Sequence, residues 1–426
     1  AVGLAFLYRH LDARAWRGGA CLVLEDAHLA SAQGDGLDIA EALLEHSVGT
    51  RPVLCLVSLS REAIEADSSL ASRIESLQNL GADTLEIERL SLTQTETHLR
   101  DGIGIEPALA HAIAPGCLGS PVYVSMLIRD WAARDLLSPT RRGLSLDPTT
   151  SLDDVLELDL DTLAERRIEG ALSQLGNRLL VERSLAMAAL VGPEPPFFVI
   201  REVGEEGLNG LLSLGLVGQR GARLVFEHGR IWWAARRMAE DRMDVERCHR
   251  ALADAWKKLG DSTGMNVDHQ VGEHRLYGGQ IEAAVMPLLR AGRQAMAEGR
   301  PGHALAASQL ALKASDGTGT LVTRAEARRR VAEALLELER PDEALEMIDE
   351  AQDLGGLDRR SVAELNLVAA RAAIAQGRVE PGRKLLLRSG RVFEALRDWR
   401  GQVEVSHGQG LLHRMEGKPE SAVRYF

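Results

Sequence analysis

Four similar segments recur along the last part of the chain, 40, 38 and 40 residues apart. Each carries a proline within its first five residues and a small residue five positions after its start. Such a segment ends one helix, begins the next and lets the two helices approach closely. The segments begin at Gly299, Glu339, Gly377 and Gly417, and their small residues are Ala304, Ala344, Gly382 and Ala422. A period near 40 residues with two helices per unit predicts an α-solenoid over residues 263–426, with the three alanines buried at helix crossings.

The bulk properties narrow the classes of protein that this chain can belong to. With 426 residues, 45% of them hydrophobic, the chain can bury several cores and is expected to be multidomain and mainly α-helical. A net charge of −12 argues against a nucleic-acid-binding surface along the whole chain. No apolar run approaches the roughly 20 residues of a membrane span, and the four cysteines form no C-x-x-C pair. We therefore expect reduced thiols, a cytoplasmic location and no membrane partner.

The first part of the chain alternates strand-like and helix-like patterns. Apolar runs at Cys21–Leu24, Pro52–Val57 and Thr84–Ile87 are typical of strands, and Asp38–His46 and Leu70–Leu80 are typical of helices. This alternation predicts βαβ units and a parallel sheet within residues 1–90. The first two strands should lie side by side, because the helix between them supplies the crossover that a parallel pair needs.

Polar residues follow the first two predicted strands at the ends that would face a ligand crevice. Glu25 and Asp26 follow the first strand, and Ser58 follows the second. One carboxylate at such a position can hold Mg²⁺ on nucleotide phosphates while another polarises water, which is the pattern of a Walker B motif. Two alternatives stay open: the acids can be ordinary strand-end residues, and Ser58 can cap a turn or a helix.

No G-x-x-x-x-G-K-[ST] phosphate-binding loop occurs anywhere in the chain. The predicted α/β nucleotide-binding core is therefore a truncated one, and the sequence is expected to be an internal piece of a longer protein. Since most phosphate contacts in such sites come from that loop, we expect this chain alone not to bind ATP with useful affinity.

The middle of the chain is predicted to be helical with one hairpin. Residues 91–137 have a helical pattern, and residues 138–160, rich in Ser, Pro, Thr, Gly and Asp, are typical of a linker. Residues 161–262 form a helical block interrupted at 216–226 by two short apolar runs around a glycine-bracketed turn. Helices on both sides of a hairpin predict a winged-helix-like domain.

Several segments, in this order, resemble the STAND class of P-loop ATPases, which includes bacterial regulators of the LuxR and MalT type and ATPase modules fused to Ser/Thr kinases or adenylate cyclases. They are Leu22–Ser31 (Walker B strand), Val53–Ser58 (sensor strand), Gly119–Val124 (the G-x-P motif of a helical lid), Phe226–His228 (after the hairpin) and Cys248–Ala253 (the helix that leads into the repeats). Three positions depart from the family pattern: Leu29 and Ser31 stand in place of Trp and Asp, and Ser60 stands in place of an Arg.

The resemblance implies a switch protein in which ATP binding and hydrolysis, with Mg²⁺, alternate the complete protein between closed and open forms. Glu25 and Asp26 would hold the metal and orient water, Ser58 would sense phosphate, and Pro121 would contact the nucleotide unless it is simply the first proline of a helix. His28, His228 and His249 are expected to be structural.

The resemblance also implies roles for the repeats. A TPR-like solenoid would sense a protein partner or a small ligand, and nucleic acid would be contacted only by an output domain outside this chain. Two alternatives remain: a non-enzymatic interaction scaffold with a degenerate nucleotide site, and the regulatory region of a larger Ser/Thr kinase or cyclase. The last repeat stops at Phe426 inside its second helix, so the solenoid is expected to continue.

Overall fold

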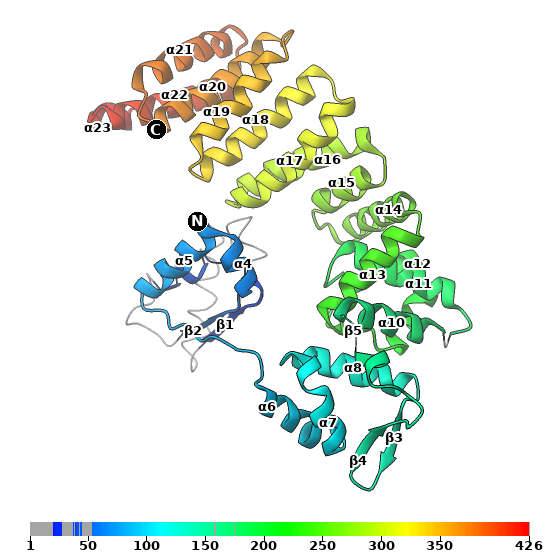
Figure 1. Ribbon diagram of the computed structural model, residues 1–426. Helices are drawn as coiled ribbons and strands as arrows, with labels where there is room; N and C mark the ends of the chain where they lie inside the picture. Colours follow the sequence, from blue (N-terminus) through cyan, green and yellow to red (C-terminus); the bar gives the residue numbers. More distant parts are fainter. Residues whose placement is uncertain are drawn as a thin grey trace. The chain divides into compact units, whose positions relative to one another are not determined.

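The computed structural model describes residues 20–27, 37, 39–41, 43–44, 53–156, 159–173 and 175–425. Two compact units are present: Leu85–Met265 forms one, and Ala1–Thr84 with Asn266–Phe426 forms the other. Figure 1 shows that the described chain is mostly helical, with short strands in three separate pairs. None of the helices in the described ranges combines the length and the apolar character that a membrane crossing requires.

The amino-terminal part contains a parallel strand pair. Strands β1 (Ala20–Leu24) and β2 (Val53–Val57) pair in register, with Leu22 opposite Cys55, which confirms the prediction that they lie side by side. Positions 39–41 and 43–44, within the predicted crossover helix Asp38–His46, are helical, as is position 37 just before it. The helices α4 (Arg61–Ala66) and α5 (Ser68–Asn79) follow β2.

The two faces of this strand pair differ in burial. Leu24, Cys55 and Val57 pack against a small core made of Ala27, Leu37, Ala40, Leu70 and Leu77. On the other face Val23, Leu54 and Leu56 are each at least half exposed. The strand pair therefore packs against helices on one side only among the described residues.

The expected third strand at Thr84–Ile87 is absent from the structure, and this prediction is wrong. The segment has no regular secondary structure, and Leu85 and Ile87 are 87% and 89% exposed. Its alternation of apolar and acidic residues has the period of a strand, but a strand also needs a neighbour for its backbone hydrogen bonds. The chain here passes from one compact unit to the other, and no described strand pairs with it. The predictions for His28, Leu29 and Ser31 lie outside the described residues.

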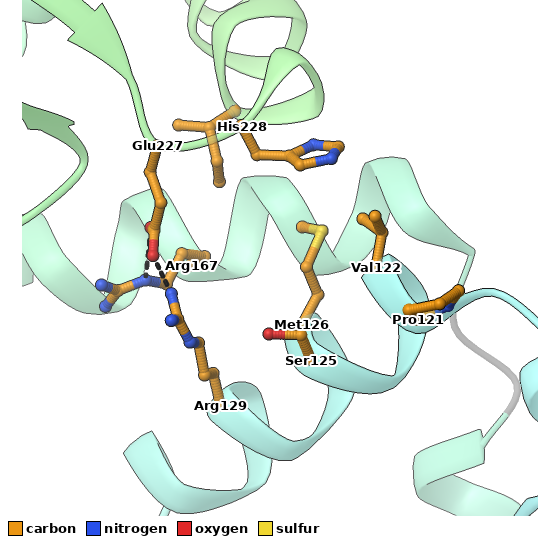
Figure 2. Close-up of a pocket in the computed structure, with 9 residues that line it drawn as sticks. Pro121, Val122, Ser125, Met126, Arg129, Arg167, Glu227 and His228 are labelled. Atoms are coloured by element: carbon orange, nitrogen blue, oxygen red, sulfur yellow. Dashed lines mark ion pairs between the residues drawn. The ribbon is translucent and has the colours of Figure 1, made fainter. Parts of the chain in front are cut away.

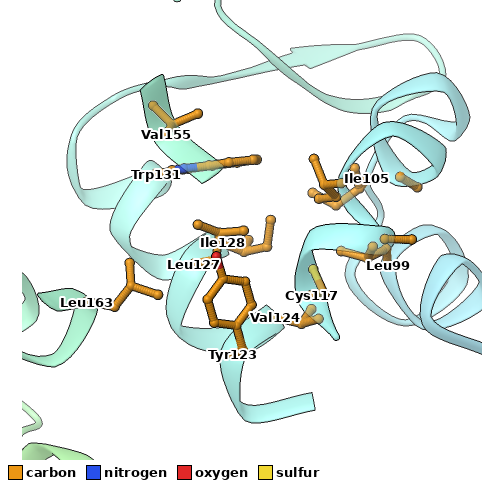
Figure 3. Close-up of a cluster of buried hydrophobic side chains, with 13 residues drawn as sticks. Leu99, Ile105, Cys117, Tyr123, Val124, Leu127, Ile128, Trp131, Val155 and Leu163 are labelled. Atoms are coloured by element: carbon orange, nitrogen blue, oxygen red, sulfur yellow. The ribbon is translucent and has the colours of Figure 1, made fainter. Parts of the chain in front are cut away.

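The unit Leu85–Met265 begins with a helical subdomain that we call the lid. Its helices are α6 (Leu92–Thr97), a π-helical turn (His98–Ile103), α7 (Pro107–Ile113), a 3₁₀ turn (Pro115–Cys117) and α8 (Pro121–Ala133). They surround a core in which Leu99, Ile113, Leu127 and Trp131 are fully buried (Figure 3). This confirms the predicted helical character of residues 91–137.

The segment that follows contains more structure than the predicted linker. Strands β3 (Leu137–Thr140) and β4 (Gly143–Leu146) form an antiparallel hairpin, and a short helix α9 (Asp153–Leu156) comes next. Leu137, Leu144 and Leu146 pack against the lid core. The high content of Ser, Pro and Gly is typical of a linker, but three leucines spaced to face one side are enough to anchor the hairpin.

The rest of this unit is a helical block with one hairpin, which we call the hairpin subdomain. Its elements are α10 (Leu160–Ser173), α11 (Arg178–Val191), α12 (Phe197–Ser213), β5 (Val217–Arg220), β6 (Arg223–Phe226), α13 (Gly229–Arg242) and α14 (Val245–Thr263). The strands pair antiparallel with Val217 opposite Phe226, as the sequence predicts. The predicted winged-helix character stays a prediction.

The final part is a stack of antiparallel helix pairs. It contains α15 (Asp268–Tyr277), α16 (Ile281–Ala297), α17 (Pro301–Thr318), α18 (Leu321–Glu337), α19 (Pro341–Asp353), α20 (Arg359–Ala375), α21 (Val379–Ala395), α22 (Trp399–Met415) and α23 (Pro419–Val423). The predicted small residues lie at helix crossings: Ala304 and Ala344 are 0% exposed and Ala422 is 3% exposed. At Gly382 an added Cβ would lie only 2.9 Å from the Ile374 side chain. The solenoid register drawn from the sequence is therefore confirmed.

One turn of the solenoid holds a glutamate in a left-handed backbone conformation. Glu339 has φ 59°, and the equivalent positions Gly299, Gly377 and Gly417 have φ between 71° and 77°. Because a side chain strains this conformation, we expect Glu339→Gly to raise the free energy of unfolding by about 0.5–1 kcal/mol. Glu346→Gly, in the interior of α19, should lower it by about 1 kcal/mol. Chemical denaturation of the two variants measures these changes in the free energy of unfolding, which should have opposite signs. A lower free energy of unfolding in both variants would contradict backbone strain at Glu339.

Candidate functional site

The structure brings Glu25, Asp26 and Ser58 together at one end of the strand pair. The backbone N–H of Asp26 donates to the Ser58 hydroxyl at 2.9 Å, and the N–H of Ser58 donates to the Leu24 carbonyl at 2.9 Å. Asp26 has φ 49°, a left-handed conformation that aspartate tolerates better than most residues. The predicted juxtaposition of these residues is thus confirmed.

Glu25 and Asp26 are the residues at this end that could hold a metal ion. Glu25 and Asp26 are both exposed, so their carboxylate oxygens are open to solvent. In the described part of the chain no group of three or more His, Cys, Asp or Glu could hold a metal ion. Mg²⁺ is usually held by one or two carboxylates, with waters and substrate phosphates completing its shell. Glu25 and Asp26 supply the number of carboxylates that such an ion usually takes from a protein.

Two serines near this end have different local roles. The Ser58 hydroxyl accepts from the Asp26 N–H, so its own proton remains to be donated. Ser60 is the N-cap of α4, and its hydroxyl accepts from the Ala63 N–H at 3.4 Å. Ser60, at the position where the STAND resemblance leads one to expect an arginine, therefore begins a helix here.

A second candidate site is a pocket of about 270 Å³ within the unit Leu85–Met265 (Figure 2). One wall is the first half of α8, and the opposite wall comes from α10, the end of β6 and the start of α13. The lining residues are Pro121, Val122, Ser125, Met126, Arg129, Arg167, Glu227, His228 and Ile231. The pocket therefore lies between the lid and the hairpin subdomain.

Pro121 is both a helix-start proline and a wall of this pocket. It occupies the first turn of α8, and the N-cap Ser120 accepts from the Tyr123 N–H at 3.3 Å. The preceding Gly119 accepts from the Leu90 N–H at 2.9 Å, which fixes the start of the helix. The two interpretations of Pro121 from the sequence do not exclude each other.

The charged groups of the pocket are two arginines and one glutamate. An ion pair joins Arg129 Nη1 to Glu227 Oε1, and Arg167 Nε lies 3.8 Å from Glu227 Oε2. Arg167 Nε is buried and makes no hydrogen bond among the described residues. Burial, and then the neighbouring Arg129 guanidinium, lower the pKa of Arg167. One carboxylate therefore faces two guanidinium groups, and the pocket keeps an excess of positive charge.

His228 contributes a hydrogen-bond donor to the same pocket. Its Nδ1 accepts from the Arg230 N–H at 3.1 Å, which assigns the proton to Nε2. Burial, and then Arg230, lower the pKa of His228, so the ring is neutral at neutral pH. The sequence predicts only a structural role for His228, and the structure adds a place in the pocket wall to its helix-capping role. Arg129 and Arg167 had no sequence signal, because each is one of many arginines on an amphipathic helix.

Comparisons with known proteins give similarities to solved structures, but no protein-family model and no curated protein match the chain. Among solved structures, the chain is similar to a Signal Transduction ATPase with Numerous Domains (STAND) protein with a tetratricopeptide repeat sensor from Pyrococcus horikoshii. The two share 12% sequence identity with a TM-score of 0.46, and the similarity covers 95% of this chain and 54% of the other. This chain thus spans about half the length of that protein.

Proposed function

We propose that this chain is part of an ATP-dependent signalling switch. The observation that carries the proposal is the meeting of Glu25, Asp26 and Ser58 at one end of a parallel strand pair, joined by the hydrogen bond from Asp26 to Ser58. Two carboxylates and a hydroxyl at the carboxyl ends of neighbouring parallel strands are suited to phosphate chemistry with a divalent cation.

The roles of these residues follow from their chemistry. One of the two carboxylates would hold Mg²⁺, which neutralises phosphate charge when bound, and the other would accept a hydrogen bond from water and orient it for attack. The Ser58 hydroxyl, held by the Asp26 N–H, would donate to a phosphate oxygen. The contact of Pro121 with a nucleotide, which the STAND resemblance implies, stays a prediction. We do not separate the roles of Glu25 and Asp26, since both are exposed at the same turn.

The solenoid is proposed to be the sensing part. Stacked helix pairs present long surfaces for a protein partner or a ligand, and α15–α23 supply nine helices of this kind in the described residues. An interaction scaffold without hydrolysis is the second candidate. It is favoured by Ser60, which caps α4 at the position where a phosphate-sensing arginine would be expected.

The test is ATP turnover by a protein in which this chain is joined to a glycine-rich phosphate-binding loop. We expect Glu25→Gln or Asp26→Asn to lower turnover by about 10²–10⁴-fold with ATP still bound. Glu65→Gln, an exposed acid of α4, serves as the matched control and should change nothing. Unchanged turnover in both site variants would favour the scaffold. Titration of Mg-ATP into residues 1–426 alone should give no measurable heat of binding.

A further inference from the structure

The outer faces of α19 and α21 carry opposite charges at equivalent positions. The two are the second helices of successive repeats, which begin 38 residues apart. Adding 38 to a position of α19 therefore gives the equivalent position of α21, and the buried Ala344 and Gly382 correspond in this way. At three exposed positions an acid of α19 corresponds to a base of α21: Glu346 to Lys384, Glu350 to Arg388, and Asp353 to Arg391.

Each outer face is a stripe of like charge. In α19, which contains no basic residue, acids at intervals of three or four share one face. In α21 the three bases share a face with Leu387, which is 49% exposed. Like charges three or four residues apart repel one another and weaken a helix, and acids in the last turn of α19 also oppose its macrodipole. Both helices therefore form against a repulsion that a partner of opposite charge would relieve. The acids of the α19 stripe are Asp342, Glu346, Asp349 and Asp353.

Most of these charges have no partner within the described part of the chain. Glu343 pairs with Arg340, and Glu350 lies 3.4 Å from Arg328 Nε. Equivalent helices of a solenoid present equivalent faces outward, so the two stripes point the same way and do not face each other within one chain. The side chains that make no ion pair among the described residues are Glu346, Asp349, Asp353, Lys384, Arg388 and Arg391.

We propose that the outer faces of α19 and α21 form a self-complementary interface between two copies of this chain. In a two-fold symmetric pair the acidic stripe of each copy meets the basic stripe of the other, so the same contact is made twice. A second copy is the partner because one chain presents both halves of the contact, and the charged positions have the same spacing on the two helices. The interface joins solenoids and needs no nucleotide, so it is independent of the proposed ATPase.

The first test is the oligomeric state of the full chain, measured by sedimentation velocity. We expect a dimer at about 0.1 M salt that dissociates at about 1 M, because the Debye length falls from about 10 Å to about 3 Å. A wild-type chain that stays monomeric at the lower salt would overturn the inference. A ladder of assemblies larger than a dimer would overturn the two-fold arrangement.

The second test reverses the charge of one stripe at a time. One variant combines Lys384→Glu with Arg391→Glu, and the other combines Glu346→Lys with Asp353→Lys, all at exposed positions without an ion pair. Each variant alone should raise the dissociation constant of the dimer at least about 100-fold, because like charges then face each other at both contacts. Mixed together, the two variants should form a mixed dimer, since an acidic stripe again meets a basic one at both contacts.

The mixture also separates the interface from a failure to fold, because misfolded chains would not regain association on mixing. Arg247→Glu combined with Lys257→Glu reverses two exposed charges of α14, in the other compact unit, and should leave the dimer unchanged. A dimer that persists in both stripe variants, or a mixture that stays monomeric, would contradict the proposed interface.

Discussion

Replacing Gly119 with alanine is expected to lower the free energy of unfolding of the unit Leu85–Met265 by about 3 kcal/mol or more. An added Cβ would lie 2.2 Å from the Leu90 carbonyl oxygen and 3.0 Å from the Leu90 backbone nitrogen. Backbone atoms cannot move aside as a flexible side chain can. The φ of +67° adds strain for any residue with a Cβ. Denaturant unfolding, followed by hydrogen exchange in α8, measures the loss.

Gly104→Ala is the matched control for this substitution. Gly104 has φ +88°, but an added Cβ would find nothing within 4 Å, so only the conformational cost of about 1 kcal/mol remains. Equal losses in the two variants would show that the contact between Gly119 and Leu90 does not hold the start of α8. A larger loss at Gly119 would show that this contact positions Pro121 at the pocket wall.

Ala344→Leu is expected to destabilise the solenoid by about 1–3 kcal/mol. Ala344 is 0% exposed and packs in the core cluster that contains Val331, Leu335 and Ile348. A larger side chain there would push α18 and α19 apart or force strained rotamers. Hydrogen exchange in α18–α20 of the full chain measures this local loss separately from the other compact unit.

Glu343→Leu provides the comparison one residue away. Glu343 is half exposed and pairs with Arg340 at 2.6 Å, and such surface ion pairs contribute little. Loss of this ion pair should therefore change the free energy of the opening that permits hydrogen exchange in α18–α20 by less than about 1 kcal/mol. If Glu343→Leu reduced hydrogen-exchange protection more than Ala344→Leu, the helix register of the repeats would be wrong.

The parts of the fold that repeat or alternate along the chain were predictable. The period of the turn segments predicts Ala304, Ala344 and Ala422 at buried helix crossings, because equivalent residues of successive repeats pack in equivalent positions. The parallel pairing of β1 and β2 followed from two apolar runs separated by enough chain for a crossover helix. Both patterns can be recognised in the sequence without knowing which particular distant residues touch.

The pocket and the hairpin β3–β4 were not predictable in the same way. The contact of Arg129 and Arg167 with Glu227 joins residues about sixty to a hundred positions apart, and nothing local distinguishes these arginines from paired surface ones. The strand predicted at Thr84–Ile87, which the structure lacks, illustrates the opposite case. Its local pattern was correct for a strand, but pairing is decided by a distant partner.

The stacking of the solenoid has a mechanical consequence. Extensive contacts join each helix from α15 to α23 to the next along the chain, and α16, α18, α20 and α22 also contact one another in series. A small rotation at one helix pair is therefore passed to the next and adds to the rotations beyond it. A rotation at one helix pair would then displace the far end of the stack further than it displaces the neighbouring pair.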